Sequence, residues 1–159
     1  MCVWNPEIDV WKEVRSFCNA VYGKDAGSFM YEYYKTICSA CESAPLSIYQ
    51  FPNAEYIKDG WIKTSDDYLQ KAKVSACNET VLRAIEREEL SIRFLKIARS
   101  PQESINRDQI VDKFIDDLKE HGVTEIRERR PLSVSKDCLK KSQYALDRQG
   151  EYILYYIMK

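Results

Sequence analysis

The chain contains few residues whose type and spacing could carry out chemistry. Cys38 and Cys41 form a C-x-x-C pair, and His121 is the only histidine. A zinc site needs further ligands at close spacing, and a redox pair gains reactivity at a helix N-terminus. The two cysteines fall instead in the last turns of a predicted helix, where the helix dipole disfavours a thiolate. We therefore expect the six cysteines to be mostly reduced packing residues, with no metal and no cofactor bound.

Acidic residues are numerous, but their spacing does not define a catalytic pair. Glycoside cleavage uses two carboxylates at a fixed separation, which sequence spacing cannot set. The five glycines are isolated, so no phosphate-binding loop is present. Glu89 and Arg93 lie four residues apart on a predicted helix, a spacing that allows an ion pair on a partly buried strip. A structural pair is the simpler interpretation, and a ligand-facing pair is the alternative.

Aromatic side chains are the other candidates for binding. The residues in question are Tyr31, Tyr34, Tyr49, Tyr56 and Trp61. Such side chains could pack in a hydrophobic core, which is their commoner role, or offer flat faces to sugar rings. The sequence leaves both interpretations open.

Helical periodicity accounts for most of the elements that must position these residues. The predicted helices span about 9–22, 25–43, from 64 or 65 to a break at Asn78, 79–99 and 107–121. Asp9 and Asn106 are expected N-caps, and Gly23 should end the first helix. The apolar residues of that helix recur at helical spacing and predict its inner face, namely Val10, Val14, Phe17 and Val21.

The rest of the chain is less regular. Residues 45–60 contain two prolines and several aromatics without a period, which indicates a long packed connection. After Gly122 the pattern favours a small β element, then a short helix from 135 or 136 to 146, and the ending YILYYIM suits a buried strand or an interface. We predict an all-α bundle of five to six helices with a small C-terminal β element. It should form a single domain, 1–159, with its core at about 5–131 and an appendage at about 132–159.

Charge and hydropathy exclude some functions. Lys and Arg number 24 and Asp and Glu 25, so no general field attracts nucleic acid, and we expect no nucleic-acid partner. No window approaches the roughly 20 apolar residues of a membrane span, and we expect no membrane partner. The opening MCVWNPEIDV lacks the features of a signal peptide, so the localisation stays unknown.

Three segments resemble one known family. They are NPEIDVWKEVRSFCNAVYGKDAGSFMYEYY, WIKTSDDYLQKAKVSACNETVLRAIEREELSIRFLKI and FIDDLKEHGVTEIRERRP. Together they are similar to the C-terminal helical domain of the bacterial domain of unknown function 4838 family. In that family the domain follows a catalytic barrel similar to those of alpha-glucuronidases and family-20 hexosaminidases, in proteins that look secreted or periplasmic. No catalytic residue can be transferred to this chain, because a barrel of about 250 residues is absent from it.

The resemblance implies a non-catalytic accessory domain of a polysaccharide-degrading glycoside hydrolase. The expected partner is the catalytic barrel of a parent enzyme or another protein, and self-association or carbohydrate binding are further expectations. One alternative is a freestanding helical interaction module. Another is a small enzyme that uses Glu86, Glu89 or His121. The accessory domain and the interaction module each need an exposed apolar face, whereas the enzyme needs a polar pocket.

Overall fold

The computed structural model describes residues 7–42, 52, 54, 56–127 and 130–141. Its helices are α1 (Val10–Tyr22), α2 (Lys24–Glu42), α3 (Asp59–Val74), α4 (Glu79–Arg99), α5 (Arg107–Glu120) and α6 (Leu132–Lys140). Two short strands, β1 (Glu125–Arg127) and β2 (Arg130–Pro131), pair antiparallel. The predicted all-α class with a small β element near the C-terminus is therefore confirmed.

Several predicted helix ends are confirmed by their hydrogen bonds. The Asp9 carboxylate accepts from the backbone N–H of Lys12 at 3.1 Å and caps α1. Asn78 does the same for α4, because its side-chain oxygen accepts from the N–H of Val81 at 2.9 Å. Gly23 ends α1 with a φ of 78°, a conformation that glycine adopts without strain. Polar caps and a terminal glycine thus define these helices as the sequence suggests.

One predicted start is wrong, and one predicted cap lacks its hydrogen bond. The third helix begins at Asp59 and not at 64 or 65, and the Thr64 hydroxyl donates to the carbonyl of Gly60 within the helix. A threonine that bonds back to the preceding turn is compatible with a helix interior, so its presence did not mark a start. Asn106 does precede α5, but it has a φ of 61° and its side chain makes no capping hydrogen bond.

The chain divides into two compact units, where the sequence predicts one domain with its core at about 5–131. Unit 1 consists of Met1–Ala44 and Asp59–Glu89, and unit 2 of Pro45–Lys58 and Leu90–Lys159. Helix α4 contributes residues to both, since the division falls between Glu89 and Leu90.

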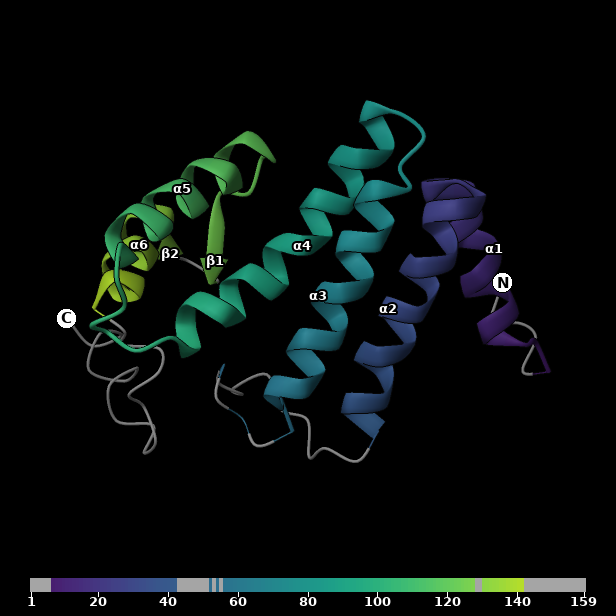
Figure 1. Ribbon diagram of the computed structural model, residues 1–159, viewed down its shortest axis with the longest axis horizontal. Coiled ribbons are helices and arrows are strands. Elements are labelled where there is room, and N and C mark those ends of the chain that lie inside the picture. The colour runs from purple at the N-terminus through teal and green to yellow at the C-terminus, as the bar shows by residue number, and fades with distance from the viewer. Residues whose placement is uncertain (1–6, 43–51, 53, 55, 128–129, 142–159) are drawn as a thin grey trace. The chain divides into compact units, whose positions relative to one another are not determined.

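In unit 1, helix α2 lies between α1 and α3 (Figure 1). Helices α1 and α2 run antiparallel, and only Gly23 separates them. The buried apolar residues of the unit are Cys18, Tyr22, Ala26, Met30, Tyr31, Tyr33, Ile62, Leu69, Ala72, Val81 and Ile85. This core places α1 at the edge of the unit, in contact with α2 on one side.

Unit 2 is built around α5. Its core cluster consists of Leu90, Ile97, Ala98, Val111, Phe114, Ile115, Leu118, Leu132 and Leu139. The last two of these belong to α6, which packs against α5 and against both strands. Residues 132–140 are therefore part of the core of unit 2, although the sequence assigned them to an appendage.

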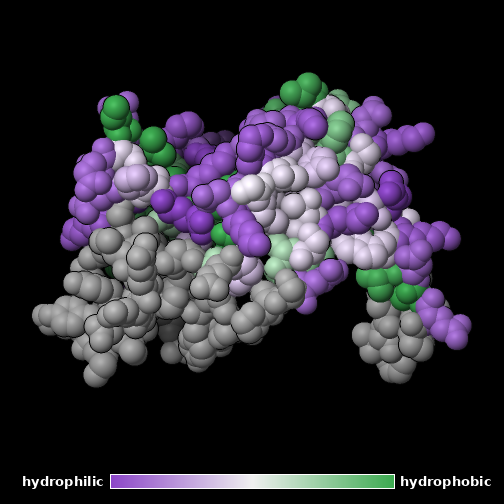
Figure 2. All heavy atoms as spheres, turned by 60° about the horizontal axis from the view of Figure 1, so that its bottom comes forward, coloured by the Kyte–Doolittle hydropathy of each residue, from purple (hydrophilic) through white to green (hydrophobic). Residues whose placement is uncertain are grey.

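Most of the described surface in Figure 2 is hydrophilic, and the hydrophobic side chains on this face form small separate groups. Among the described residues, no helix is both long enough and apolar enough to cross a membrane. Tyr49 and the ending YILYYIM lie outside the described residues.

Candidate functional site

Tyr31, predicted either to pack or to face carbohydrate, is a packing residue. It is buried under α1, where its ring makes an edge-to-face contact with Trp11 at 5.8 Å between ring centres. The guanidinium of Arg15 lies 3.9 Å above the same ring, a favourable cation–π arrangement. Trp11 and Arg15 of α1 thus cover Tyr31, and its buried ring is not available to stack on a sugar.

Tyr34 belongs to a chain of polar groups inside unit 1. Its hydroxyl lies 2.9 Å from that of Tyr22, and either oxygen could be the donor. A hydrogen bond from Tyr34 also lowers the pKa of the Glu88 carboxyl. The chain joins α1, α2 and α4, and the buried Tyr33 ring lies against that of Tyr34.

The surroundings of this chain disfavour ionisation of its members. Burial raises the pKa of Glu88, and the Tyr34 hydrogen bond and the charge of Arg87 offset only part of that rise. Burial also raises the pKa of Tyr22, Tyr33 and Tyr34. Raised pKa values occur at active sites and in structural networks alike. Here every polar member already bonds to another, so the chain is best explained as an internal connection between three helices.

We expect Glu88→Gln to raise the free energy of unfolding by about 1 kcal/mol at neutral pH, because the amide keeps a hydrogen bond to Tyr34 and removes a desolvated charge. When folding raises the pKa of a carboxyl, the group stabilises the fold fully at a pH below the pKa that it has in the unfolded chain. This contribution is lost as the pH rises through the pKa that the carboxyl has in the folded protein. The advantage of the variant should therefore vanish by a pH of about 4. Urea unfolding of both proteins across that pH range measures the difference.

Tyr34→Phe is the control for this prediction. It removes the hydrogen bond that lowers the pKa of Glu88, so the pH at which the carboxyl titrates should move upward. A stability difference between Glu88→Gln and the wild type that does not change with pH would show that Glu88 is not desolvated.

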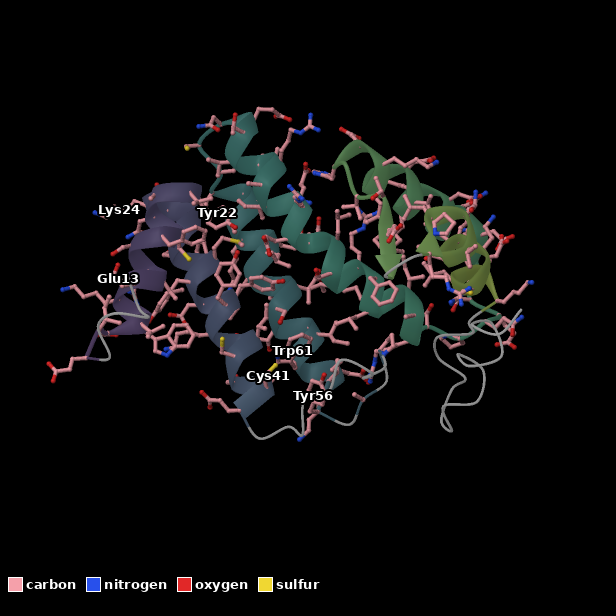
Figure 3. The ribbon with its side chains drawn as sticks, turned by 180° about the vertical axis from the view of Figure 1, so that it is seen from behind. Glu13, Tyr22, Lys24, Cys41, Tyr56 and Trp61 are labelled. Carbon is pink, nitrogen blue, oxygen red and sulfur yellow. The ribbon has the colours of Figure 1, made fainter. Side chains whose placement is uncertain are left out.

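Trp61 is a half-buried residue of α3, and its indole N–H donates to the carbonyl of Thr36 in α2 at 2.9 Å. This bond fixes the ring against α2, which agrees with a packing role. Tyr56 is half-buried and belongs to unit 2 (labelled in Figure 3), and Tyr49 lies outside the described residues. Of the predicted aromatic residues that the structure describes, Tyr31, Tyr34 and Trp61 thus belong to unit 1 and Tyr56 to unit 2.

Glu89 and Arg93, which the sequence paired with each other, each have a partner on another helix. Glu89 is buried, and its two oxygens accept from Gln70 at 2.7 Å and from Lys73 at 2.9 Å, both on α3. Arg93 donates to Asp117 of α5 at 2.7 Å. The spacing of four residues drew attention to two charged groups that link helices. It did not reveal that the partner of each group lies on a different helix.

Asp117 shows how these pairs are stabilised. Burial alone would raise the pKa of its carboxyl, but hydrogen bonds from Arg93 and Lys113 hold that pKa below its usual value. In the same unit, hydrogen bonds from Lys136 and Lys140 lower the pKa of Asp112. These carboxylates are charged and paired at neutral pH, which suits links between helices better than proton transfer.

Arg107 is the most extensively bonded side chain that sequence reasoning missed. It is buried in unit 2, and its guanidinium donates to the carbonyls of Leu139, Ile97, Ser100 and Pro101 at 2.7 to 3.1 Å. These carbonyls lie at or just beyond the C-terminal ends of α4 and α6, which carry partial negative charge. Burial lowers the pKa of Arg107, although the nearby Asp108 opposes this effect. The residue closes two helix ends and leaves no donor directed at a ligand.

The cysteines that the structure describes are not grouped with other metal-binding side chains. Among the described residues there is no group of three or more His, Cys, Asp and Glu side chains that could hold a metal ion. Cys38 is exposed and Cys41 half-buried near the end of α2, and Cys18 is buried between α1 and α2.

The most unusual surface of unit 1 is an apolar stripe on α1. Val10, Phe17 and Val21 are exposed to 53%, 55% and 40%, and Val14 beside them is half-buried. We call these four residues the α1 face. The sequence predicted them as the inner face of the helix, and this prediction is wrong: the residues buried against the rest of unit 1 are Cys18 and Tyr22.

Helix α1 therefore has two apolar faces. Each residue advances about 100° around a helix, so the α1 face lies roughly a quarter of a turn from the face formed by Trp11, Cys18 and Tyr22. The second face packs on α2. One of the two apolar faces is satisfied inside the unit, and the other is presented to the surroundings.

Neither a protein-family model, nor a curated protein, nor a solved structure matches this chain. The polar clusters connect helices within each unit. The α1 face makes no such connection within unit 1, and we therefore take the α1 face as the candidate functional site.

Proposed function

We propose that this chain is a non-catalytic helical module that docks against another protein surface through the α1 face. The observation that carries the proposal is the exposure of Val10, Phe17 and Val21 along one side of a well-capped helix. Single exposed apolar residues are common, but several in register on one helix form the pattern by which amphipathic helices bind partners.

The contacts inside unit 1 support a rigid docking helix. Asp9 caps its start, Gly23 ends it, and Trp11, Cys18 and Tyr22 fix it on α2. A helix that is held in place before binding loses little conformational freedom when a partner arrives. The side chains of the α1 face are thus presented in a preorganised row.

An accessory domain on a glycoside hydrolase barrel is the form of this function that the family resemblance favours. In that form, the α1 face would be covered by the barrel, and the accessory domain would add no catalytic group. The small-enzyme alternative has less support, because both oxygens of Glu89 accept hydrogen bonds from neighbouring side chains. The geometry favours docking over catalysis.

Phe17→Glu tests the docking face. Because the side chain is exposed, we expect the variant to fold with a free energy of unfolding within about 0.5 kcal/mol of the wild type, while a charge in the middle of the stripe abolishes binding. Stability is measured by urea unfolding. Binding is measured by calorimetry against a purified alpha-glucuronidase-type barrel.

Val74→Glu is the matched control, because Val74 is 89% exposed at the end of α3 and lies outside the α1 face. It should change neither stability nor binding. If Phe17→Glu unfolds the chain, the stripe belongs to the core and the proposal is rejected. If the wild type does not bind the barrel, that partner is rejected.

A further inference from the structure

We propose that the α1 face binds a second copy of this chain, with the two α1 helices antiparallel about a two-fold axis. The inference rests on the proposed docking function and names a second copy, in place of a barrel, as the partner of the α1 face. It follows from the spacing of the stripe and from the charges near its two ends, and the size of the stripe indicates how strong the pairing is.

The stripe is complementary to itself when one copy is reversed. Its residues are spaced four, three and four apart, which is the spacing of the seam in a coiled coil. A two-fold axis through the middle of the helix sets Val10 opposite the partner's Val21 and Val14 opposite the partner's Phe17. Every apolar residue then faces another, and the same patch serves both copies, as an isologous interface requires.

Charges near the ends of the stripe favour the antiparallel orientation. Glu7 and Asp9 are exposed at the N-terminal end of α1, whereas Lys24 and Asp25 are exposed just beyond its C-terminal end, so the N-terminal end is the more acidic of the two. Glu13 of α1 and Lys24, the first residue of α2, both lie at the outer edge of unit 1 in Figure 3. In an antiparallel pair each acidic end lies beside the partner's Lys24, and the helix dipoles oppose. A parallel pair would instead set acid against acid, which is unfavourable.

The size of the α1 face predicts a weak, reversible dimer. The exposed parts of Val10, Phe17 and Val21 provide on the order of a few hundred Å² per copy. Stable dimers bury at least about 1,200 Å² in total, so one helix stripe falls short of that size. We therefore expect monomers in dilute solution and dimers as the concentration rises.

The first experiment measures mass by sedimentation equilibrium over a concentration series of the full chain. The wild type and Val74→Glu should rise from the monomer toward twice its mass, and Phe17→Glu should stay monomeric while remaining folded by circular dichroism. A wild type that is monomeric up to millimolar concentration overturns the self-pairing. The docking proposal is judged separately, by the folding of Phe17→Glu and by barrel binding.

A charge exchange tests the orientation. Lys24→Glu should weaken the dimer several-fold, because it sets like charges beside each other at both ends of the antiparallel pair. Adding Glu7→Lys to this variant should restore the affinity of the dimer. Addition of salt should reduce the difference between the variants. A dimer that Phe17→Glu leaves intact, or one that the second exchange does not restore, contradicts the antiparallel α1 pair.

Discussion

Arg107→Met is expected to lower the free energy of unfolding of unit 2 by about 3 kcal/mol. Its guanidinium donates to four backbone carbonyls that close the ends of α4 and α6. Methionine fills similar space but donates nothing, so those carbonyls are left inside the protein without this partner. Unfolding in urea, followed by far-ultraviolet circular dichroism, measures the loss.

Two variants distinguish the stabilising effect of the several guanidinium donors from that of the positive charge. Arg107→Lys keeps the charge but cannot donate in several directions at once, so most of the loss should remain. Arg87→Met removes an exposed arginine of α4 and should change stability by no more than about 0.5 kcal/mol.

Tryptophan fluorescence provides a second probe, because Trp11 and Trp61, the tryptophans that the structure describes, both belong to unit 1. Loss of Arg107 should shift the circular dichroism transition more than the tryptophan fluorescence transition. If Arg107→Met is as stable as the wild type, the prediction is wrong, and water satisfies the backbone carbonyls that Arg107 bonds in the wild type.

The helix boundaries that the sequence predicted correctly depend on local chemistry. Asp9 and Asn78 accept hydrogen bonds from nearby backbone N–H groups, and Gly23 adopts a positive φ, so each acts within a few residues of its own position. Local propensity and capping are readable from sequence for this reason. The start of α3 was missed because Thr64 is also a capping residue type, and its interior position is not visible in the sequence.

The α1 face was misassigned for a different reason. Periodicity reveals that Val10, Val14, Phe17 and Val21 share a stripe, but it cannot reveal which stripe a neighbouring helix covers. The covered face uses Cys18 and Tyr22, a small residue and an aromatic with a polar end, which score poorly in an apolar pattern. Two apolar faces on one short helix are the sequence signal that could have indicated an edge helix with a second partner.

The polar clusters were beyond sequence reasoning because their members come from different helices. Glu89 was singled out by its spacing, yet its partners are on α3, and Glu88 was not singled out at all. Arg107 did carry a signal: an arginine in the first turn opposes the dipole of its own helix. The position of Arg107 is explained by its hydrogen bonds to the C-terminal ends of two other helices, α4 and α6.

Gly27→Ala should destabilise unit 1 by about 2–3 kcal/mol, because the backbone of α1 lies close against α2 at this glycine. A Cβ atom there would lie 2.7 Å from the carbonyl oxygen of Cys18 and 3.1 Å from the Cα of Asn19. Both contacts are with backbone, which cannot turn aside as a side chain can, so α1 must move away from α2. Tryptophan fluorescence during urea unfolding follows the effect, since Trp11 lies on α1.

Gly60→Ala is the matched control, and it should have the opposite sign. Gly60 also lies in the first turn of a helix, α3, but a Cβ at this position meets nothing within 4 Å. Alanine there restricts the unfolded chain without a clash, so we expect a gain of about 0.5 kcal/mol. If both variants gain stability, α1 is not held closely on α2. The α1 face would then lose the fixed support that makes it a preorganised docking surface.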